Sequence, residues 1–366
     1  MLVEGLLEQI NKGREGSNWG LPMGLPRLEQ YIDGVSKSTY TLLFSGSGVG
    51  KTSLALYAYI YRPIMDCIER GNDKLKILYI SLEMKGEVLL AKLLSTYIFE
   101  TYGVEISYKE MVSKTRGKVL SDKEYELIEK SVPWLAEVEK RLIIYDKALT
   151  AAAFSKLLTS LAEKFGTFKE DSTRRIYQAN DPDMIMEVVV DHLSLTTPTA
   201  GNSLKTEMDN ISKIAVNFRN TCSFSFLMLM QVNRDSSNVE RRKLELLEPQ
   251  RSDVKDSGNM EQDCDLMVSI FNPHREKLKS YRGYDISTLG SNFRAILLLK
   301  SRYGDGDVSV GCNYFGKSNI WKELPKADQI YDYERYTTID TYKKQTEEIK
   351  NEELDLNYKN NIEIIL

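Results

Sequence analysis

One short segment constrains the fold of this chain more than any other part of its sequence. Residues 45–52 read Ser-Gly-Ser-Gly-Val-Gly-Lys-Thr, after the β-prone run 39–44 and before the helical pattern 53–61. A glycine-rich loop between a strand and a helix aims backbone N–H groups at phosphate oxygens, and the helix dipole adds positive potential there. This order of elements therefore predicts an α/β domain with a phosphate-binding loop.

The loop contains the residue types that hold ATP and Mg²⁺. It follows the pattern G-x-x-x-x-G-K-[ST], in which the lysine reaches the β- and γ-phosphates and the hydroxyl coordinates Mg²⁺. Lys51 and Thr52 fill these positions, whereas Ser45 replaces the first glycine. The alternative is a flexible strand–helix turn that binds nothing. The predicted nucleotide-binding residues are Ser45, Gly46, Ser47, Gly48, Val49, Gly50, Lys51, Thr52 and Ser53.

Strand-like and helix-like patterns alternate along the chain, which predicts a mostly parallel sheet flanked by helices. The apolar runs that indicate strands are 77–81, 142–145, 186–190, 224–230, 266–271 and 293–300. The periodic segments that indicate helices are 2–11, 88–99, 151–164 and 204–219. Glycine and aspartate at 304–307 predict a β-hairpin. Residues 232–260 predict a long mobile loop, and the core is expected to close near Pro325.

Two carboxylates are candidates for the chemistry of hydrolysis. Asp191 follows the strand 186–190, where a parallel sheet places its ligands, so it is predicted to be a second Mg²⁺ anchor. Glu83 follows the strand 77–81, which we expect beside the phosphate-loop strand, and it is predicted to position and deprotonate the attacking water. The alternatives are an aspartate that caps a strand and a glutamate that stabilises a helix N-terminus. His192 is expected to serve packing rather than catalysis.

Composition excludes several classes of protein. No apolar run approaches the roughly 20 residues of a membrane span, and the N-terminus lacks the pattern of a signal peptide, so we expect a cytoplasmic protein. The four cysteines, expected to be buried core residues, and the two histidines have no zinc-site spacing. Residues 326–366 hold ten acidic against six basic side chains and thus carry the whole net charge of −4. Any affinity for DNA would then have to come from local basic loops rather than from the overall charge.

Several segments, in order, resemble the RecA-like ATPase domain of the DnaB-type replicative helicases. The likeness is clearest at 253–265, Asp-Val-Lys-Asp-Ser-Gly-Asn-Met-Glu-Gln-Asp-Cys-Asp, which is similar to the family's D-L-R-E-S-G-x-I-E-Q-D-A-D. The phosphate loop resembles the form of the phage primase-helicases, and a phage protein would act in the cytoplasm of a bacterial host. The other similar segments are 20–34, 81–84 (the Ser-Leu-Glu-Met motif), 117–146, 189–193 and 230–234.

The resemblance implies roles for further residues. Gln231 would couple nucleotide state to the DNA loops. In the K-x-R-x-G segment 300–304, Lys300 and Arg302 would reach into the nucleotide site of a neighbouring subunit, with Arg302 as the arginine finger. Lys255, Asp256 and Gly258 would lie in a loop that faces the DNA backbone. Basic side chains on the same loop add phosphate contacts: Arg234, Arg241, Arg242 and Lys243.

The resemblance covers roughly 20–325, the predicted helicase ATPase domain. Residues 1–19 are predicted to be a helix and linker that dock on a subunit, and 326–366 an acidic tail. The family's N-terminal collar domain, which contacts primase, is not recognised in the sequence. The expected function is an ATP-dependent helicase, a hexameric ring that moves 5′ to 3′ on single-stranded DNA and unwinds forked DNA. A RecA- or KaiC-like ATPase that remodels DNA or protein and an inactive scaffold remain alternatives.

Overall fold

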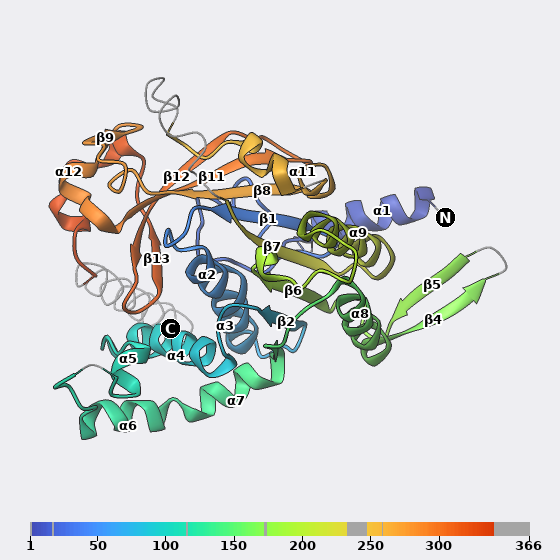
Figure 1. Ribbon diagram of the computed structural model, residues 1–366, viewed down its shortest axis with the longest axis horizontal. Coiled ribbons are helices and arrows are strands. Elements are labelled where there is room, and N and C mark those ends of the chain that lie inside the picture. The colour runs from blue at the N-terminus through green and yellow to red at the C-terminus, as the bar shows by residue number, and fades with distance from the viewer. Residues whose placement is uncertain are drawn as a thin grey trace, which may run out of the picture.

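A nine-stranded sheet forms the centre of the molecule (Figure 1). The computed structural model describes residues 2–16, 18–114, 116–171, 174–232, 247–257 and 259–339. In spatial order the strands are β13 (Ile320–Glu323), β12 (Val308–Phe315), β11 (Phe293–Ser301), β8 (Leu266–Phe271), β1 (Tyr40–Ser45), β7 (Ser225–Gln231), β6 (Ile185–Asp191), β2 (Leu75–Ser81) and β3 (Leu142–Tyr145). The six strands from β8 to β3 are parallel, and β11, β12 and β13 extend the sheet by antiparallel pairing.

This sheet confirms the predicted fold class, a mostly parallel sheet with a C-terminal hairpin region. One expectation about its order is wrong, because β2 does not lie beside the phosphate-loop strand β1. β7 and β6 separate the two strands. The order of a parallel sheet is set by how the crossover connections pack on its faces, not by the order of strands in the chain. Glu83 therefore reaches the phosphate loop only by way of the end of β6.

The two faces of the sheet carry separate hydrophobic cores, because successive side chains of a strand point to opposite faces. On β1, Leu43 belongs to one core, with the helix after the phosphate loop and α4 (Gly86–Tyr102). Leu42 and Phe44 belong to the other, with α8 (Ala151–Phe165) and α9 (Leu204–Cys222). The helix after the loop is built of α2 (Lys51–Leu54), a π-helical segment (Ala55–Tyr61) and α3 (Arg62–Glu69).

Two regions contain elements that the sequence patterns did not suggest. Three helices lie between α4 and β3, namely α5 (Tyr108–Met111), α6 (Asp122–Lys130) and α7 (Val132–Arg141). A β-hairpin, formed by β4 (Gly166–Asp171) and β5 (Arg174–Ala179), projects from the body beyond α8 (Figure 1). Phe168 and Tyr177 face each other across it at 5.2 Å between ring centroids. The hairpin lies between a helix and a strand that were both predicted.

A third core lies under the C-terminal strands, among short elements. These are β9 (Ser280–Tyr281), β10 (Tyr284–Asp285), α12 (Ile286–Leu289) and 3-10 turns at Gly290–Asn292, Ala327–Gln329 and Glu334–Tyr336. Buried contacts continue past Pro325, since Ile330 and Ile339 are both buried.

The end of the predicted mobile loop 232–260 is structured. Residues 233–246 and 258 lie outside the described residues, but Arg251–Ser257 forms a 3-10 helix and Met260–Asp263 forms α11. Val254 and Met260 are fully buried in the second core. This apolar anchoring, two residues within a charged segment, is why the expectation of an unstructured loop is wrong for this part.

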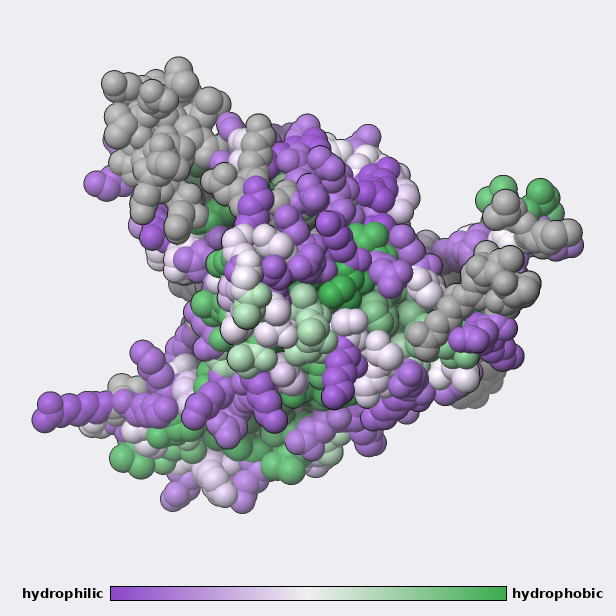
Figure 2. Space-filling model, turned by 45° about the vertical axis from the view of Figure 1, so that its right-hand side comes forward, coloured by the Kyte–Doolittle hydropathy of each residue, from purple (hydrophilic) through white to green (hydrophobic). Residues whose placement is uncertain are grey.

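The N-terminal helix α1 (Leu2–Arg14) confirms the helix predicted at 2–11 and leaves its apolar side chains exposed, among them Val3, Leu6, Leu7 and Ile10. On the face shown in Figure 2, apolar side chains lie among more numerous hydrophilic ones. Of the helices described, none has the length and apolarity to cross a bilayer. The four cysteines are all buried, as predicted.

Candidate nucleotide site and its relation to known proteins

The phosphate loop lies at the carboxyl edge of the parallel strands. Ser45, the last residue of β1, pairs in register with Gln231, the last residue of β7. Gly48 and Gly50 have φ values of 68° and 119°, which side chains disfavour. A Cβ atom at Gly50 would also lie only 2.9 Å from Cζ2 of Trp321. These two glycines are therefore required by backbone conformation or by space.

Ser45 shows why the first glycine of the pattern is dispensable here. It is fully buried and is absent from the residues with positive φ. Its hydroxyl donates a hydrogen bond of 3.1 Å to the carbonyl oxygen of Gly46. A serine thus fits this position without backbone strain.

Lys51 lies inside the loop that it serves. Its Nζ donates to the carbonyl oxygens of Ser45 and Gly46 at 3.0 and 3.2 Å, and the residue is buried. An ammonium group has three donors on a flexible stem and can exchange such partners for phosphate oxygens. Lys51 therefore lies close enough to the loop to bind a phosphate held there, as predicted from the sequence.

Asp191 ends β6 and is buried. Tyr79 donates a hydrogen bond of 2.7 Å to its Oδ2, whereas Oδ1 is buried and accepts no hydrogen bond. Burial raises the pKa of this carboxyl, and hydrogen bonding by Tyr79 and Thr52 opposes that rise. A buried carboxylate oxygen without a donor, close to a threonine hydroxyl, is the donor set that Mg²⁺ prefers. The residues present therefore fit the predicted metal.

Glu83 and His192 meet beside Asp191. The backbone N–H of Leu82 donates to the carbonyl oxygen of Asp191 at 2.7 Å, which ties the ends of β2 and β6 together. Glu83 Oε2 lies 4.0 Å from Nε2 of His192, and the Glu83 side chain is 56% exposed. Burial lowers the pKa of His192, although Asp191 and Glu83 oppose the shift. His192 is consequently neutral at neutral pH and offers no positive charge to the Glu83 carboxylate.

Three residues that the sequence patterns missed support the loop from its other side. Arg275 Nη1 donates to the carbonyl oxygen of Ser47 at 2.7 Å, and Arg294 Nε donates to that of Val49 at 2.9 Å. The Arg294 guanidinium lies 5.5 Å from the ring centroid of Tyr314. Burial lowers the pKa of Arg294 to about 10. Of these three residues, only Arg294 could have been noticed in the sequence, because it is a charged residue within an apolar strand pattern.

The Tyr314 hydroxyl also lies 2.8 Å from Oγ of Ser53, and its ring stacks on Trp321 at 4.7 Å. β12 and β13 thereby reach the helix that begins the nucleotide site, although they follow it by more than 250 residues. Only the fold brings these segments together.

Lys300 and Arg302 lie at the opposite edge of the sheet. The backbone N–H of Arg302 bonds the carbonyl oxygen of Asp265, and the N–H of Asp265 bonds that of Tyr40, the first residue of β1. The phosphate loop begins at the other end of β1. Five steps of about 3.3 Å separate these ends by roughly 17 Å. The structure therefore does not bring the two basic residues to the phosphate loop of their own chain.

The structure describes only some of the residues that are predicted to contact DNA. Arg234, Arg241, Arg242, Lys243 and Gly258 lie outside the described residues. The backbone of Lys255 and Asp256 belongs to the 3-10 helix Arg251–Ser257, but their side chains lie outside what is described. Their contact with DNA stays a prediction.

Residues 20–319 match the family model described as "DnaB-like helicase C terminal domain". The chain belongs to this family. Among curated proteins, replicative DNA helicase DnaB of Helicobacter pylori strain 26695 is 24% identical over 287 residues, which are 77% of this chain and 48% of that protein. DnaB of Mycoplasma pneumoniae is 23% identical over 306 residues, 82% of this chain and 56% of that protein. The chain thus spans about half the length of these DnaB proteins.

Solved structures of helicase ATPase domains have the same fold. One solved ATPase domain matches with a TM-score of 0.67 at 18% identity, over 89% of this chain and 99% of that one. A DnaB-like replicative helicase, studied with its primase interactions, matches with a TM-score of 0.64 at 17% identity, over 87% of this chain and 68% of that one. These likenesses confirm the RecA-like DnaB architecture that the ordered motifs suggested.

Proposed function

We propose that this DnaB-family chain is the ATP-driven motor of a replicative DNA helicase. The observation that carries the proposal is the meeting of Lys51, Asp191, Glu83 and Gln231 at one edge of the sheet, in a chain of this family. A nucleotide-binding scaffold needs only the first of these residues. A hydrolase also needs a metal ligand and a base; Asp191 ends the strand β6, and Glu83 follows β2, the strand that pairs with β6.

The proposed roles in one subunit are those of a phosphate-loop hydrolase. Lys51 exchanges the carbonyl oxygens of its loop for the β- and γ-phosphates, and Thr52 and Asp191 hold Mg²⁺. The metal held by Thr52 and Asp191 would supply positive charge against the charge that develops on the transferred phosphoryl group. Glu83 orients and deprotonates the attacking water. Gln231 stands at the end of the strand next to the loop, where it can respond to the γ-phosphate.

Arg275 and Arg294 act on the loop itself. By occupying the carbonyl oxygens of Ser47 and Val49, their guanidinium groups fix the outward side of the loop. A phosphate-binding nest needs its backbone N–H groups to face the phosphates, and carbonyl oxygens held by guanidinium groups favour that orientation.

The site is completed by a second subunit. Because Arg302 and Lys300 lie about one strand length from their own phosphate loop, they can act on a nucleotide only in trans. A guanidinium supplied in trans stabilises the charge on the γ-phosphoryl group and makes hydrolysis depend on assembly. The proposed assembly is a hexameric ring, and the exposed apolar face of α1 docks on an adjacent subunit.

The substrate is proposed to be DNA. The basic loop 234–255 and residues Lys255, Asp256 and Gly258 contact the phosphate backbone of single-stranded DNA in the central channel, with movement 5′ to 3′. Primase and other replisome proteins are the proposed partners. Residues 326–339 pack against the domain through Ile330 and Ile339, so the proposed acidic tail that solubilises the chain or screens the channel is restricted to 340–366.

A strand-separation assay tests the proposal directly. The purified protein, with Mg²⁺ and ATP, is expected to separate a forked duplex that bears a 5′ single-stranded tail, and Lys51→Ala is expected to be inactive. ATP hydrolysis on single strands without any strand separation would sink the helicase function and favour a RecA- or KaiC-like remodelling ATPase. Electron microscopy of the ATP-bound protein then separates closed rings from open filaments.

A further inference from the structure

The C-terminal turn of α11 holds the ammonium group of Lys300. Lys300 Nζ donates to the carbonyl oxygens of Glu261 at 2.5 Å and of Cys264 at 2.7 Å, and it lies 3.5 Å from that of Gln262. The last carbonyls of a helix have no partner within the helix and carry its negative dipole end. Lys300 satisfies these carbonyls and in return has its donors occupied.

Arg302 is held at the same place. Its Nη2 donates to the carbonyl oxygen of Gln262 at 3.0 Å, and its Nη1 lies 3.1 Å from Oδ1 of Asp265. Asp265 is fully buried and also pairs with Arg219, whose Nη1 lies 2.7 Å from Oδ2. The buried carboxylate therefore positions the Arg302 guanidinium against α11.

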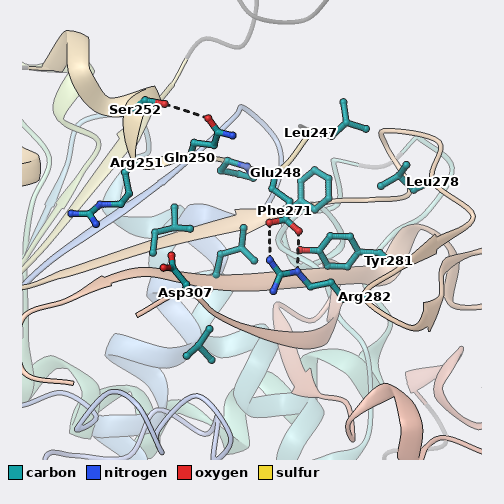
Figure 3. A pocket seen from close by; sticks show the side chains of 14 residues that line it. Leu247, Glu248, Gln250, Arg251, Ser252, Phe271, Leu278, Tyr281, Arg282 and Asp307 are labelled. Atoms are coloured by element: carbon teal, nitrogen blue, oxygen red, sulfur yellow. Dashed lines mark hydrogen bonds and ion pairs between the residues drawn. The ribbon is translucent and has the colours of Figure 1, made fainter. Parts of the chain in front are cut away.

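The segment 247–259, which leads into α11, is packed at its two ends, and a cavity lies beneath its first part. Figure 3 shows the cavity, of about 530 Å³, with Leu247 and Glu248 at one side and Gln250, Arg251 and Ser252 at the other. Arg282 fixes Glu248 through two hydrogen bonds of 2.9 Å. On the far side, the buried Val254 and Met260 anchor the segment in the second core.

The cavity floor is apolar, formed by side chains of β8 and β11 such as Phe271, Leu297 and Leu299. Close packing transmits and resists displacement, whereas a void beneath a segment removes that resistance. Residues 249–252, which line the cavity, therefore have room to shift over the floor, whereas Val254 and Met260 stay anchored in the second core.

We infer that the α11 turn and Asp265 are a holding site for Lys300 and Arg302, and that these two side chains leave it when they bind the nucleotide of the neighbouring subunit. The inference rests on the proposed function, because it needs the two residues to act in trans. Phosphate oxygens and α11 carbonyls compete for the same N–H donors. Engagement in trans thus frees the carbonyl oxygens of α11 and loosens the segment before it, which includes the C-terminal part of the basic loop 234–255.

This competition makes the binding of nucleotide and the binding of DNA favour each other. If nucleotide in one subunit frees α11 of its neighbour, then DNA that stabilises the freed form strengthens nucleotide binding by the same factor, because coupling between two ligands is reciprocal. Asp265 is a positioning residue in this scheme, since it reaches the nucleotide only through Arg302.

Hydrogen exchange on the full chain tests the inference. In the free protein the amides of Asp263 and Cys264 are bonded to the carbonyl oxygens of Asn259 and Met260. A non-hydrolysable ATP analogue with Mg²⁺ is expected to accelerate their exchange at least ~5-fold in assembled rings, the lower end of typical coupling between sites. Lys300→Met, which keeps the aliphatic stem, is expected to exchange fast without the analogue and to gain nothing from it.

Lys156, an exposed lysine of α8, gives the matched control. Lys156→Met is expected to behave like the wild type in every arm. If Lys300→Met does not fold, Asp265→Asn replaces it. The second readout is the Kd for a single-stranded oligothymidylate with and without the analogue, whose ratio is expected between about 5 and 150 in the wild type and near 1 in Lys300→Met.

The inference and the proposed function fail in different ways. Unchanged exchange of the α11 amides in wild-type rings that bind the analogue, while Arg302→Ala still abolishes turnover, overturns the holding site and leaves the trans finger intact. Undiminished turnover of Arg302→Ala overturns the trans assignment itself. Equal Kd ratios for the wild type and Lys300→Met also overturn the holding site.

Discussion

The two ends of the parallel strands in the central sheet hold basic side chains in different surroundings. At the carboxyl edge, Lys51 and Asp191 are buried beside the phosphate loop, and Oδ1 of Asp191 accepts no hydrogen bond. At the amino edge, Lys300 and Arg302 are partly exposed and donate hydrogen bonds to carbonyl oxygens of α11, and Arg302 also forms an ion pair with Asp265. Both edges hold basic side chains against carbonyl oxygens of their own chain, although they are about one strand length apart.

The difference teaches what each edge can do alone. The carboxyl edge is formed by loops that converge after parallel strands, so one chain can complete a nucleotide cradle there. The amino edge, in the part of the chain that the structure describes, has no phosphate loop. In the proposed function, its basic residues act on hydrolysis only at the carboxyl edge of another subunit. Five experiments probe this division, in order of decreasing expected effect.

Loss of the cradle lysine is expected to have the largest effect. Lys51→Ala should lower ATP turnover by at least ~10³-fold and weaken nucleotide binding, because it removes a cation from the β- and γ-phosphates. Steady-state hydrolysis and equilibrium binding of an ATP analogue measure the two parts. Retained turnover would show that the carboxyl edge is not the hydrolysis site.

Loss of the finger should affect turnover but not binding. Arg302→Ala is expected to lower DNA-stimulated kcat by ~10³-fold or more, the range found for arginine fingers, with little change in the Kd for ATP. Single-turnover hydrolysis separates the two quantities. A matching loss of ATP affinity would mean that Arg302 belongs to the cradle, against the assignment to separate edges.

Mixed rings test whether the two edges come from different chains. Neither Lys51→Ala nor Arg302→Ala is active alone, but a random equal mixture has an intact loop opposite an intact finger at about a quarter of its interfaces. Partial recovery of ATP hydrolysis on mixing is the expected result. A mixture as inactive as its components would contradict completion of the site in trans.

The buried carboxylate of Asp191 is expected to lower the stability of the metal-free protein while it is needed for ATP hydrolysis. Burial raises the pKa of its carboxyl in the folded chain. In the unfolded chain an aspartate has a pKa of about 3.9. Because the pKa of Asp191 is higher in the folded chain, its full contribution to stability is present below pH 3.9 and is lost as pH rises through the folded pKa. Asp191→Asn has no group that ionises, so it should not lose this stability. Relative to the wild type, its free energy of unfolding should be higher by up to ~1 kcal/mol above the folded pKa and equal at acid pH.

Denaturant unfolding of the metal-free variant and wild type at several pH values measures this difference. Asp191→Asn should also lose Mg²⁺-dependent ATP hydrolysis. A variant that is less stable than the wild type at neutral pH would mean that hydrogen bonding by Tyr79 and Thr52 outweighs the cost of burying the carboxylate.

Restoring the usual loop glycine should have the smallest effect. Ser45→Gly is expected to change kcat and KM for ATP by less than ~2-fold, because Ser45 adopts no glycine-specific backbone conformation, and to lower stability by roughly 0.5–1 kcal/mol. Kinetics and thermal unfolding measure both. A large gain in activity would show that the serine is a functional difference.

Local pattern was enough for much of the carboxyl edge. Strand, glycine loop and helix succeed one another within a few residues, so phosphate chemistry could be predicted for Lys51 and Thr52. Asp191 and Glu83 could be found because each ends an apolar run. In each case the informative residues are neighbours in sequence, and their role depends on backbone geometry that local sequence dictates.

Tertiary structure alone decided what lies between and behind these segments. It inserted β7 and β6 between β2 and β1, it brought Arg275, Arg294 and Tyr314 to the loop, and it placed Lys300 at the far edge against α11. Such contacts join residues far apart in the chain through crossover packing and strand pairing. Since their energy comes from burial and pairing with distant partners, no local pattern records them.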